Sequence, residues 1–309
     1  MVKPGKDAPS DTLNPFQEEP SDAPKPSPSK NNEVFEFVKQ LGIELAQGEF
    51  DLPPFPDTAL KVQQCINDPD SDIQSLAAIV ATEPGLAARL MRMANSAMMR
   101  RGPLEVSDIP TAISRVGMDM VQNVAVSFAA REAFKVPPGS LCISELNALR
   151  QESLRVASIS YLLGQHVGSI HKPEEAMLAG LLNCVGKFYI IMKAADHPAL
   201  FTDREALDKL QAQWHTGVAR AIVESWDFPE SIAIAVDEQE IRERDRIGSA
   251  DLSDLLFVSN LIARIGIQVA AELGDLDPLA RMRMNSEKLA ELLVTHEESI
   301  DSMVASLGG

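Results

Sequence analysis

The side chains that most often carry metal or acid–base chemistry are few in this sequence. It holds five histidines, and none of them belongs to an HExxH pair or stands directly before an aspartate. A hydrolytic metal centre needs imidazoles and carboxylates that converge on one ion, which then lowers the pKa of bound water. Asn183 and Cys184, just before Gly186, offer a neutral amide oxygen and a soft sulfur instead. The sequence therefore predicts no catalytic residue, no metal site and no cofactor.

The motifs of nucleophilic catalysis and of phosphate-binding loops are also missing. No GxSxG, GxxxxGKS/T or GxGxxG pattern occurs. The cysteines Cys65, Cys142 and Cys184 lie far apart and form no CxxC pair, which is typical of reduced, mostly buried thiols. Because there is no signal-peptide pattern and no apolar run of 18 residues, we expect a cytoplasmic protein that does not enter a membrane.

Arginine is concentrated in one short stretch, which contains Arg89, Arg92, Arg100 and Arg101. This cluster contrasts with the composition of the chain as a whole, in which 28 basic and 45 acidic side chains give a net charge of −17. Such an acidic surface repels phosphate backbones, so we expect no binding to nucleic acids. The cluster has two interpretations. It is a solvated helix face, or it is a patch that binds an anion, a nucleotide or the edge of a partner.

The elements that position these residues are predicted to be helices. Apolar residues make up 45% of the chain but aromatic residues only 5%, and this aliphatic composition favours helices over sheets. No run alternates as a strand does, and Ser71 and Ser107 are expected to cap two of the helices. Gly186 is expected to form a tight turn between two apolar helices. In the second half, helices are predicted near residues 144–166, 173–182, 203–212, 215–226, 229–240, 251–271 and 286–303.

Two stretches mark the organisation of the chain. Residues 1–32 are rich in proline, serine and acidic residues, and we expect them to form a disordered tail because they bury too little apolar surface. The VPPG sequence at residues 136–139 is the clearest internal break. The fold is therefore predicted to be all-α, a multi-helix bundle in two helical subdomains.

Three motifs resemble the HDOD domain, a module of bacterial signalling proteins. They are LPPFP at Leu52–Pro56, the EPGLAARLMRMANSA segment at Glu83–Ala97, and the AISRVG segment at Ala112–Gly117. The resemblance extends over about residues 48–245. It implies an N-terminal helical half at residues 33–138, a half similar to the HD phosphohydrolases at residues 139–245, and flanking helices at residues 246–309.

The resemblance also implies where the metal ligands of an HD phosphohydrolase would lie. The first histidine falls on Glu152 and the His–Asp pair on Asn183 and Cys184, whereas one middle histidine is kept as His215. The remaining positions, a histidine pair and an aspartate, fall on Glu238, Gln239 and Asn260. One imidazole with a few amides does not retain a divalent ion. We therefore expect a degenerate site, kept as a pocket without metal between the two helical halves.

Three functions follow as hypotheses. The first is a non-catalytic regulator that binds a protein partner in a bacterial signalling pathway. The second is a metal-dependent phosphohydrolase with unconventional ligands. The third is a module that senses a small nucleotide, held in the degenerate site or beside Arg89 and Arg92.

Overall fold

The computed structural model describes residues 30–47, 55–100 and 104–308. Within these ranges every regular element is a helix, which confirms the all-α prediction. The expected tail up to residue 29, the start of the LPPFP motif at residues 52–54, and Arg101 lie outside the described residues. The first helix begins at Lys30, two residues before the expected end of the tail.

The N-terminal half consists of six helices. Pro84 occupies the first turn of its helix, as its fixed φ angle favours. Two other helices begin one residue later than predicted, because the side chains of Asp72 and Asp108 cap them in place of Ser71 and Ser107. The helices are α1 (Lys30–Gln47), α2 (Asp57–Asn67), α3 (Ile73–Ala81), α4 (Pro84–Asn95), α5 (Ile109–Val116) and α6 (Met118–Ala133).

The next six helices contain two departures from the prediction. The expected helices at 203–212 and 215–226 form one continuous helix, and Gly186 lies inside a helix rather than in a turn. The break between the two apolar helices falls instead at Asn183 and Cys184. The helices are α7 (Ile143–His166), α8 (Pro173–Leu182), α9 (Val185–Ala194), α10 (Pro198–Thr202), α11 (Arg204–Ser225) and α12 (Glu230–Glu238).

The last part of the chain is more finely divided than expected. The predicted helix at 251–271 is broken at Gly266, whose φ of 91° favours glycine, and the one at 286–303 is divided at His296. The elements are α13 (Leu252–Ile265), the 3-10 helix η1 (Ile267–Glu272), α14 (Asp277–Arg281), α15 (Ser286–Thr295) and α16 (Glu297–Gly308).

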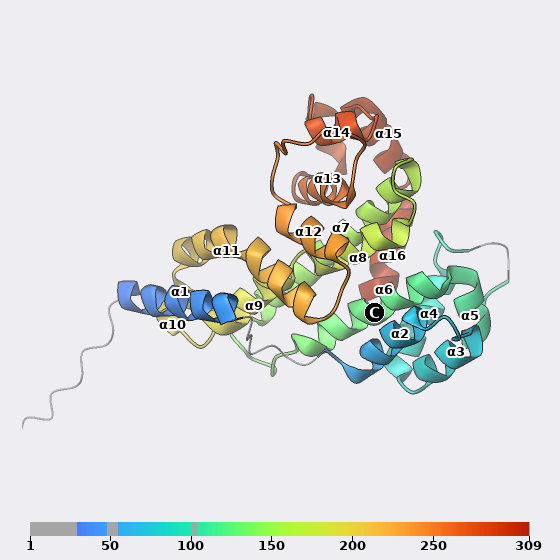
Figure 1. Cartoon of the computed structure of the whole chain (residues 1–309), viewed down its shortest axis with the longest axis horizontal. Coiled ribbons are helices and arrows are strands. Elements are labelled where there is room, and N and C mark those ends of the chain that lie inside the picture. Colours follow the sequence, from blue (N-terminus) through green and yellow to red (C-terminus); the bar gives the residue numbers. More distant parts are fainter. Residues whose placement is uncertain (1–29, 48–54, 101–103, 309) are drawn as a thin grey trace, which may run out of the picture.

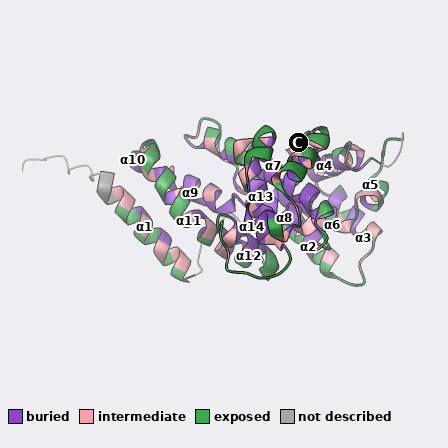
Figure 2. Ribbon diagram, turned by 90° about the horizontal axis from the view of Figure 1, so that it is seen from above, coloured by how far each residue is buried: buried purple, intermediate pink, exposed green. Residues whose placement is uncertain are grey.

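Two clusters of buried side chains hold the helices together. The larger one extends from α1 to α12, so that the two expected halves share it, and it includes Met303 and Leu307 of α16. The smaller one lies between the second half of α7 and the elements from α13 to α16. Figure 1 shows α13, α14 and α15 on one side of α7 and α12, and Figure 2 shows the buried surfaces facing inward. The stretch Pro173–Ala194 is apolar and long enough to cross a membrane, but 83% of its most apolar 18-residue window is buried inside the protein as core.

The last helix, α16, is fixed to the N-terminal half by hydrogen bonds to its C-terminal carbonyl groups. Arg89 of α4 donates to the carbonyl oxygens of Leu307 at 2.8 Å and Gly308 at 3.3 Å. The Ser127 hydroxyl of α6 donates to Leu307 O at 3.0 Å. The last carbonyls of a helix have no partner within it and carry partial negative charge, so an arginine satisfies both needs.

Candidate functional site

The junction between α8 and α9 is positioned by unusually close helix packing. A Cβ atom on Gly186 would lie 2.0 Å from the His215 carbonyl oxygen and 2.8 Å from the Ala219 amide nitrogen, so only glycine allows α9 to approach α11 this closely. Gly180 of α8 packs in the same way against Ala157 of α7, where a Cβ would lie 2.5 Å from Cα. These contacts bring Asn183 beside the side chains of α11, α12 and α13.

Three buried amide side chains form a closed ring of hydrogen bonds at this junction. Asn183 Nδ2 donates to Asn260 Oδ1 at 2.7 Å, and Asn260 Nδ2 donates to Gln239 Oε1 at 2.9 Å. Gln239 Nε2 closes the ring by donating to the Asn183 backbone oxygen at 3.0 Å, and it also donates to Val236 O at 2.7 Å. All three residues are at most 3% exposed. We call these three residues the amide ring.

A buried imidazole is paired with a carboxylate near the amide ring. His215 is 1% exposed, and its Nε2 lies 3.2 Å from Glu240 Oε1, in a contact that is close but poorly aligned as a hydrogen bond. Glu240 also forms an ion pair with Arg264. The contact with His215, followed by that with Arg264, lowers the pKa of Glu240 to about 2, so this carboxylate is ionised at neutral pH.

Cys184 follows Asn183 and is completely buried. Burial raises the pKa of its thiol to about 12, so the thiolate needed for nucleophilic attack is scarce near neutral pH. Glu152, on α7, forms an ion pair of 3.5 Å with Lys187 of α9. This ion pair places a cation next to the carboxylate that takes the position of the first expected histidine.

The structure separates Glu238 from the other predicted site residues. Its carboxylate accepts a hydrogen bond from Ser253 at 3.0 Å and lies 2.7 Å from Arg244 Nη2. Glu240, which the sequence reasoning did not include, contacts His215 instead. The pair that faces the site is therefore Gln239 and Glu240, one residue later than the expected pair. The sequence alone does not show this shift of one residue, because Gln239 and Glu240 lie just after the end of α12, where the helical repeat no longer fixes the direction of the side chains.

The residues present do not fit a catalytic divalent ion. In the ranges 30–47, 55–100 and 104–308, no group of three His, Cys, Asp or Glu side chains is arranged to hold a metal. The amide oxygens of Asn260 and Gln239 already accept hydrogen bonds within the ring, so Asn183 Oδ1, which has no partner among the described residues, is a single neutral ligand atom. A Mg²⁺ or Mn²⁺ ion requires several oxygen ligands, with carboxylates among them, which this arrangement does not supply.

The arginines of the predicted basic patch do not form one surface. The Arg89 side chain is buried, with the residue 4% exposed, and it holds α16, whereas Arg92 and Arg100 are exposed. Arg101 lies outside the described residues. The interpretation of the four residues as a single exposed patch is therefore corrected, because the Arg89 side chain is buried against α6 and α16.

The sequence of this chain is similar to a known domain family and to a curated protein. Residues 52–241 match the HDOD domain. An uncharacterised protein of Treponema pallidum (strain Nichols) is 22% identical over 214 residues, which are 66% of this chain and 40% of that protein. The chain thus spans two fifths of the length of this curated relative.

Two solved structures share the fold. The "Putative metal-dependent phosphohydrolase" from Shewanella amazonensis SB2B has a TM-score of 0.72 and 23% identity, covering 89% of this chain and 99% of the other. The "Putative signal transduction protein" from Marinobacter aquaeolei VT8 has a TM-score of 0.59 and 20% identity, covering 91% of this chain and 66% of the other. Identities this low show likeness of fold alone. The HDOD match, however, covers more than half of the chain, and the chain therefore belongs to the HDOD domain family.

Proposed function

We propose that this protein is a non-catalytic regulator that acts in bacterial signal transduction by binding a protein partner. The observation that supports this proposal is the amide ring of Asn183, Gln239 and Asn260. The resemblance to the HD phosphohydrolases implies that these residues take positions of metal ligands. In this chain three hydrogen bonds join them and hold α8, the end of α12 and α13 together, while Asn183 Oδ1 has no partner among the described residues.

The neighbouring groups support the same proposal. Hydrolysis needs an activated water or another nucleophile near a general acid or base. The Cys184 thiol is protonated and buried, and the single imidazole, His215, is paired with a carboxylate that is also bound by Arg264. These contacts rigidify the junction of four helices, as expected of a scaffold that presents its outer surface to a partner.

The names of the structural relatives favour different functions. The Marinobacter protein is named for signal transduction, which agrees with the proposal, whereas the Shewanella protein is named for metal-dependent phosphohydrolysis. The composition of the site favours the first, because three amides stand where the second needs metal ligands.

The proposal is tested with the purified full chain. After incubation with Mn²⁺ and Zn²⁺ followed by dialysis, we expect less than stoichiometric metal by elemental analysis and no turnover of p-nitrophenyl phosphate or cyclic dinucleotides. Affinity capture from the source cytoplasm is then compared between the wild-type chain and His215→Ala. We expect both to retain the same partner, since a scaffold does not need the imidazole. Stoichiometric metal together with turnover that His215→Ala abolishes would establish the phosphohydrolase instead.

A further inference from the structure

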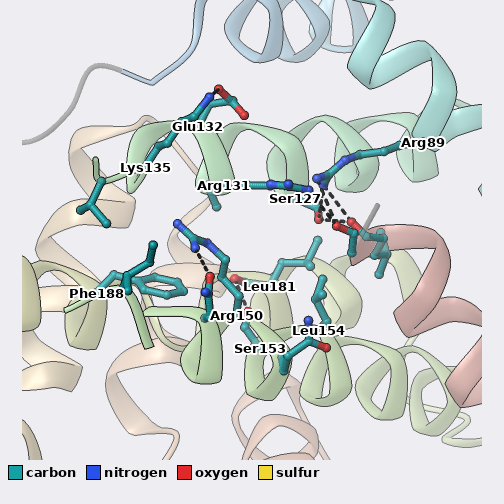
Figure 3. A pocket seen from close by; sticks show the side chains of 17 residues that line it. Arg89, Ser127, Arg131, Glu132, Lys135, Arg150, Ser153, Leu154, Leu181 and Phe188 are labelled. Atoms are coloured by element: carbon teal, nitrogen blue, oxygen red, sulfur yellow. Dashed lines mark hydrogen bonds and ion pairs between the residues drawn. The ribbon is translucent and has the colours of Figure 1, made fainter. Parts of the chain in front are cut away.

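A pocket of about 390 Å³ lies between α6, α7 and the end of α16, away from the amide ring. Figure 3 shows Arg131 of α6 and Arg150 of α7 in the space between these two helices, with Phe188 of α9 at one side. Its volume lies within the range of about 300–1,000 Å³ that is usual for small-molecule sites. The pocket is therefore large enough for a small metabolite.

The pocket concentrates positive charge in an otherwise acidic protein. Four of the charged side chains that line it are basic, namely Arg89, Arg131, Lys135 and Arg150, and among the described lining residues Glu132 is the one acid. Glu132 lies 3.4 Å from Lys135, so its charge is directed at that lysine. The whole chain has a net charge of −17, so four basic side chains around one pocket differ from its acidic composition.

The guanidinium groups in the pocket are close enough to affect one another. Burial, followed by the positive charges of Arg131 and Arg92, lowers the pKa of Arg89 to about 10. Burial and the charge of Arg131 also lower the pKa of Arg150. Like charges gathered in a partly closed space repel one another, and a bound anion relieves this repulsion.

Arg150 has hydrogen-bonding capacity that the described residues do not use. Its Nη2 donates to Phe134 O at 2.6 Å and its Nη1 to Asn147 Oδ1 at 2.8 Å. Its Nε is buried and has no hydrogen-bond partner among the described residues. Because this buried atom is closed to a ligand, the donors that remain are on the terminal nitrogens: Nη1 and Nη2 each use one N–H and keep a second that a ligand oxygen can accept.

Part of the pocket lining is apolar. Val136 and Ile143 are at least partly exposed there, whereas Phe188, Leu154 and Leu181 are almost completely buried. A ligand that fits this pocket thus has an anionic group for the basic side chains and an apolar body for the two exposed ones. Phosphate suits the arginines, and a nucleobase suits the aliphatic side chains.

We propose that this pocket binds a nucleoside monophosphate, with its phosphate at Arg131, Lys135 and Arg150 and its base against Val136 and Ile143. No residue of the amide ring lines the pocket, and the proposal does not depend on the proposed function. Of the arginines predicted as a patch, Arg89 lines this pocket, and the described Arg92 and Arg100 do not.

Isothermal titration calorimetry with the full chain tests the proposal, using AMP, GMP, adenosine and inorganic phosphate as probes. We expect at least one monophosphate to bind with a Kd below about 1 mM at about 50 mM salt, and more weakly at about 300 mM salt because screening weakens charge contacts. Adenosine should not bind measurably, and phosphate should bind more weakly than the monophosphate. If phosphate and the monophosphates bind equally, the assignment of a nucleoside is overturned.

Three variants locate the binding. Lys135→Ala removes an exposed charge at the pocket, and Arg150→Lys keeps the charge but loses the fork of donors. We expect each to weaken monophosphate binding about tenfold, as the loss of one charge-assisted hydrogen bond would. Lys209→Ala, an exposed lysine on α11, removes the same charge elsewhere and should leave the affinity unchanged. The proposal is overturned if neither monophosphate binds below about 1 mM, or if Lys135→Ala binds as tightly as wild type.

Discussion

Replacing Asn260 with alanine tests whether the amide ring holds the protein together. Asn260 is 3% exposed, accepts from Asn183 Nδ2 at 2.7 Å and donates to Gln239 Oε1 at 2.9 Å. Alanine can do neither. The substitution leaves one buried donor and one buried acceptor without these partners, in a space that solvent does not reach.

The expected loss follows from the two hydrogen bonds. Each buried polar atom left without a partner costs about 1–3 kcal/mol, and the shorter side chain adds a small cavity. A water molecule that enters the vacated space recovers part of this energy. We therefore expect the free energy of unfolding to fall by about 2–5 kcal/mol, which is a large part of the stability of an ordinary domain.

Urea unfolding followed by far-UV circular dichroism measures this loss. Asn67→Ala, at an exposed asparagine at the end of α2, is the matched control and should change the free energy of unfolding by less than about 0.5 kcal/mol. A double-mutant cycle with Asn183→Ala should give a coupling energy above about 0.5 kcal/mol. A loss below about 1 kcal/mol for Asn260→Ala would refute the reasoning, since it would mean that the ring contributes little.

Two further predictions concern the helix contact and the ion pair beside the ring. Gly186→Ala should lower the thermal midpoint, because its Cβ would lie 2.0 Å from His215 O, with a loss of about 1–3 kcal/mol or more. Gly217→Ala, whose Cβ meets nothing within 4 Å, should raise it slightly, and equal midpoints for the two variants would contradict the argument. Glu240→Gln should destabilise the protein by about 1–2 kcal/mol at pH 7, discounted for the partial exposure of this carboxylate. Because the pKa of Glu240 falls from 4.5 to about 2 on folding, its contribution to stability is present above pH 4.5 and disappears toward pH 2. Urea unfolding of the wild type and of Glu240→Gln measures this contribution. The same difference in free energy of unfolding near pH 2 and at pH 7 would contradict this origin.

Local patterns predicted the helices well but not the contacts between them. The place of Pro84 in the first turn of α4 follows from a local property, because its own ring fixes its φ angle at a helical value. Glycine is common in turns, so the sequence places Gly186 in one, but the residue lies in a helix whose close contact with α11 leaves no room for a Cβ, and no local pattern shows this contact. The offset from Glu238 to Glu240 arises similarly, because the end of α12 is directed by hydrogen bonds to α8 and α13.

Two arginines of α4 also show that a sequence pattern does not reveal contacts between distant helices. Arg89 and Arg92 are three residues apart and carry the same charge, so the sequence treats them alike. One is buried against α16 and the other is exposed, and the difference arises from residues more than 200 positions later in the chain. The pocket between α6 and α7 was missed for the same reason, since its basic residues come from separate helices.

The hydrogen bond between Arg89 and Leu307 also has a consequence for biosynthesis. The two residues are 218 positions apart, so at about 5–20 residues per second roughly 10–40 s pass between their synthesis. During this interval the face of α4 that α16 later covers is open, together with a guanidinium group that is buried in the finished protein. We therefore expect the N-terminal helices to complete their packing only after α16 has been synthesised, with this face of α4 exposed to solvent until then.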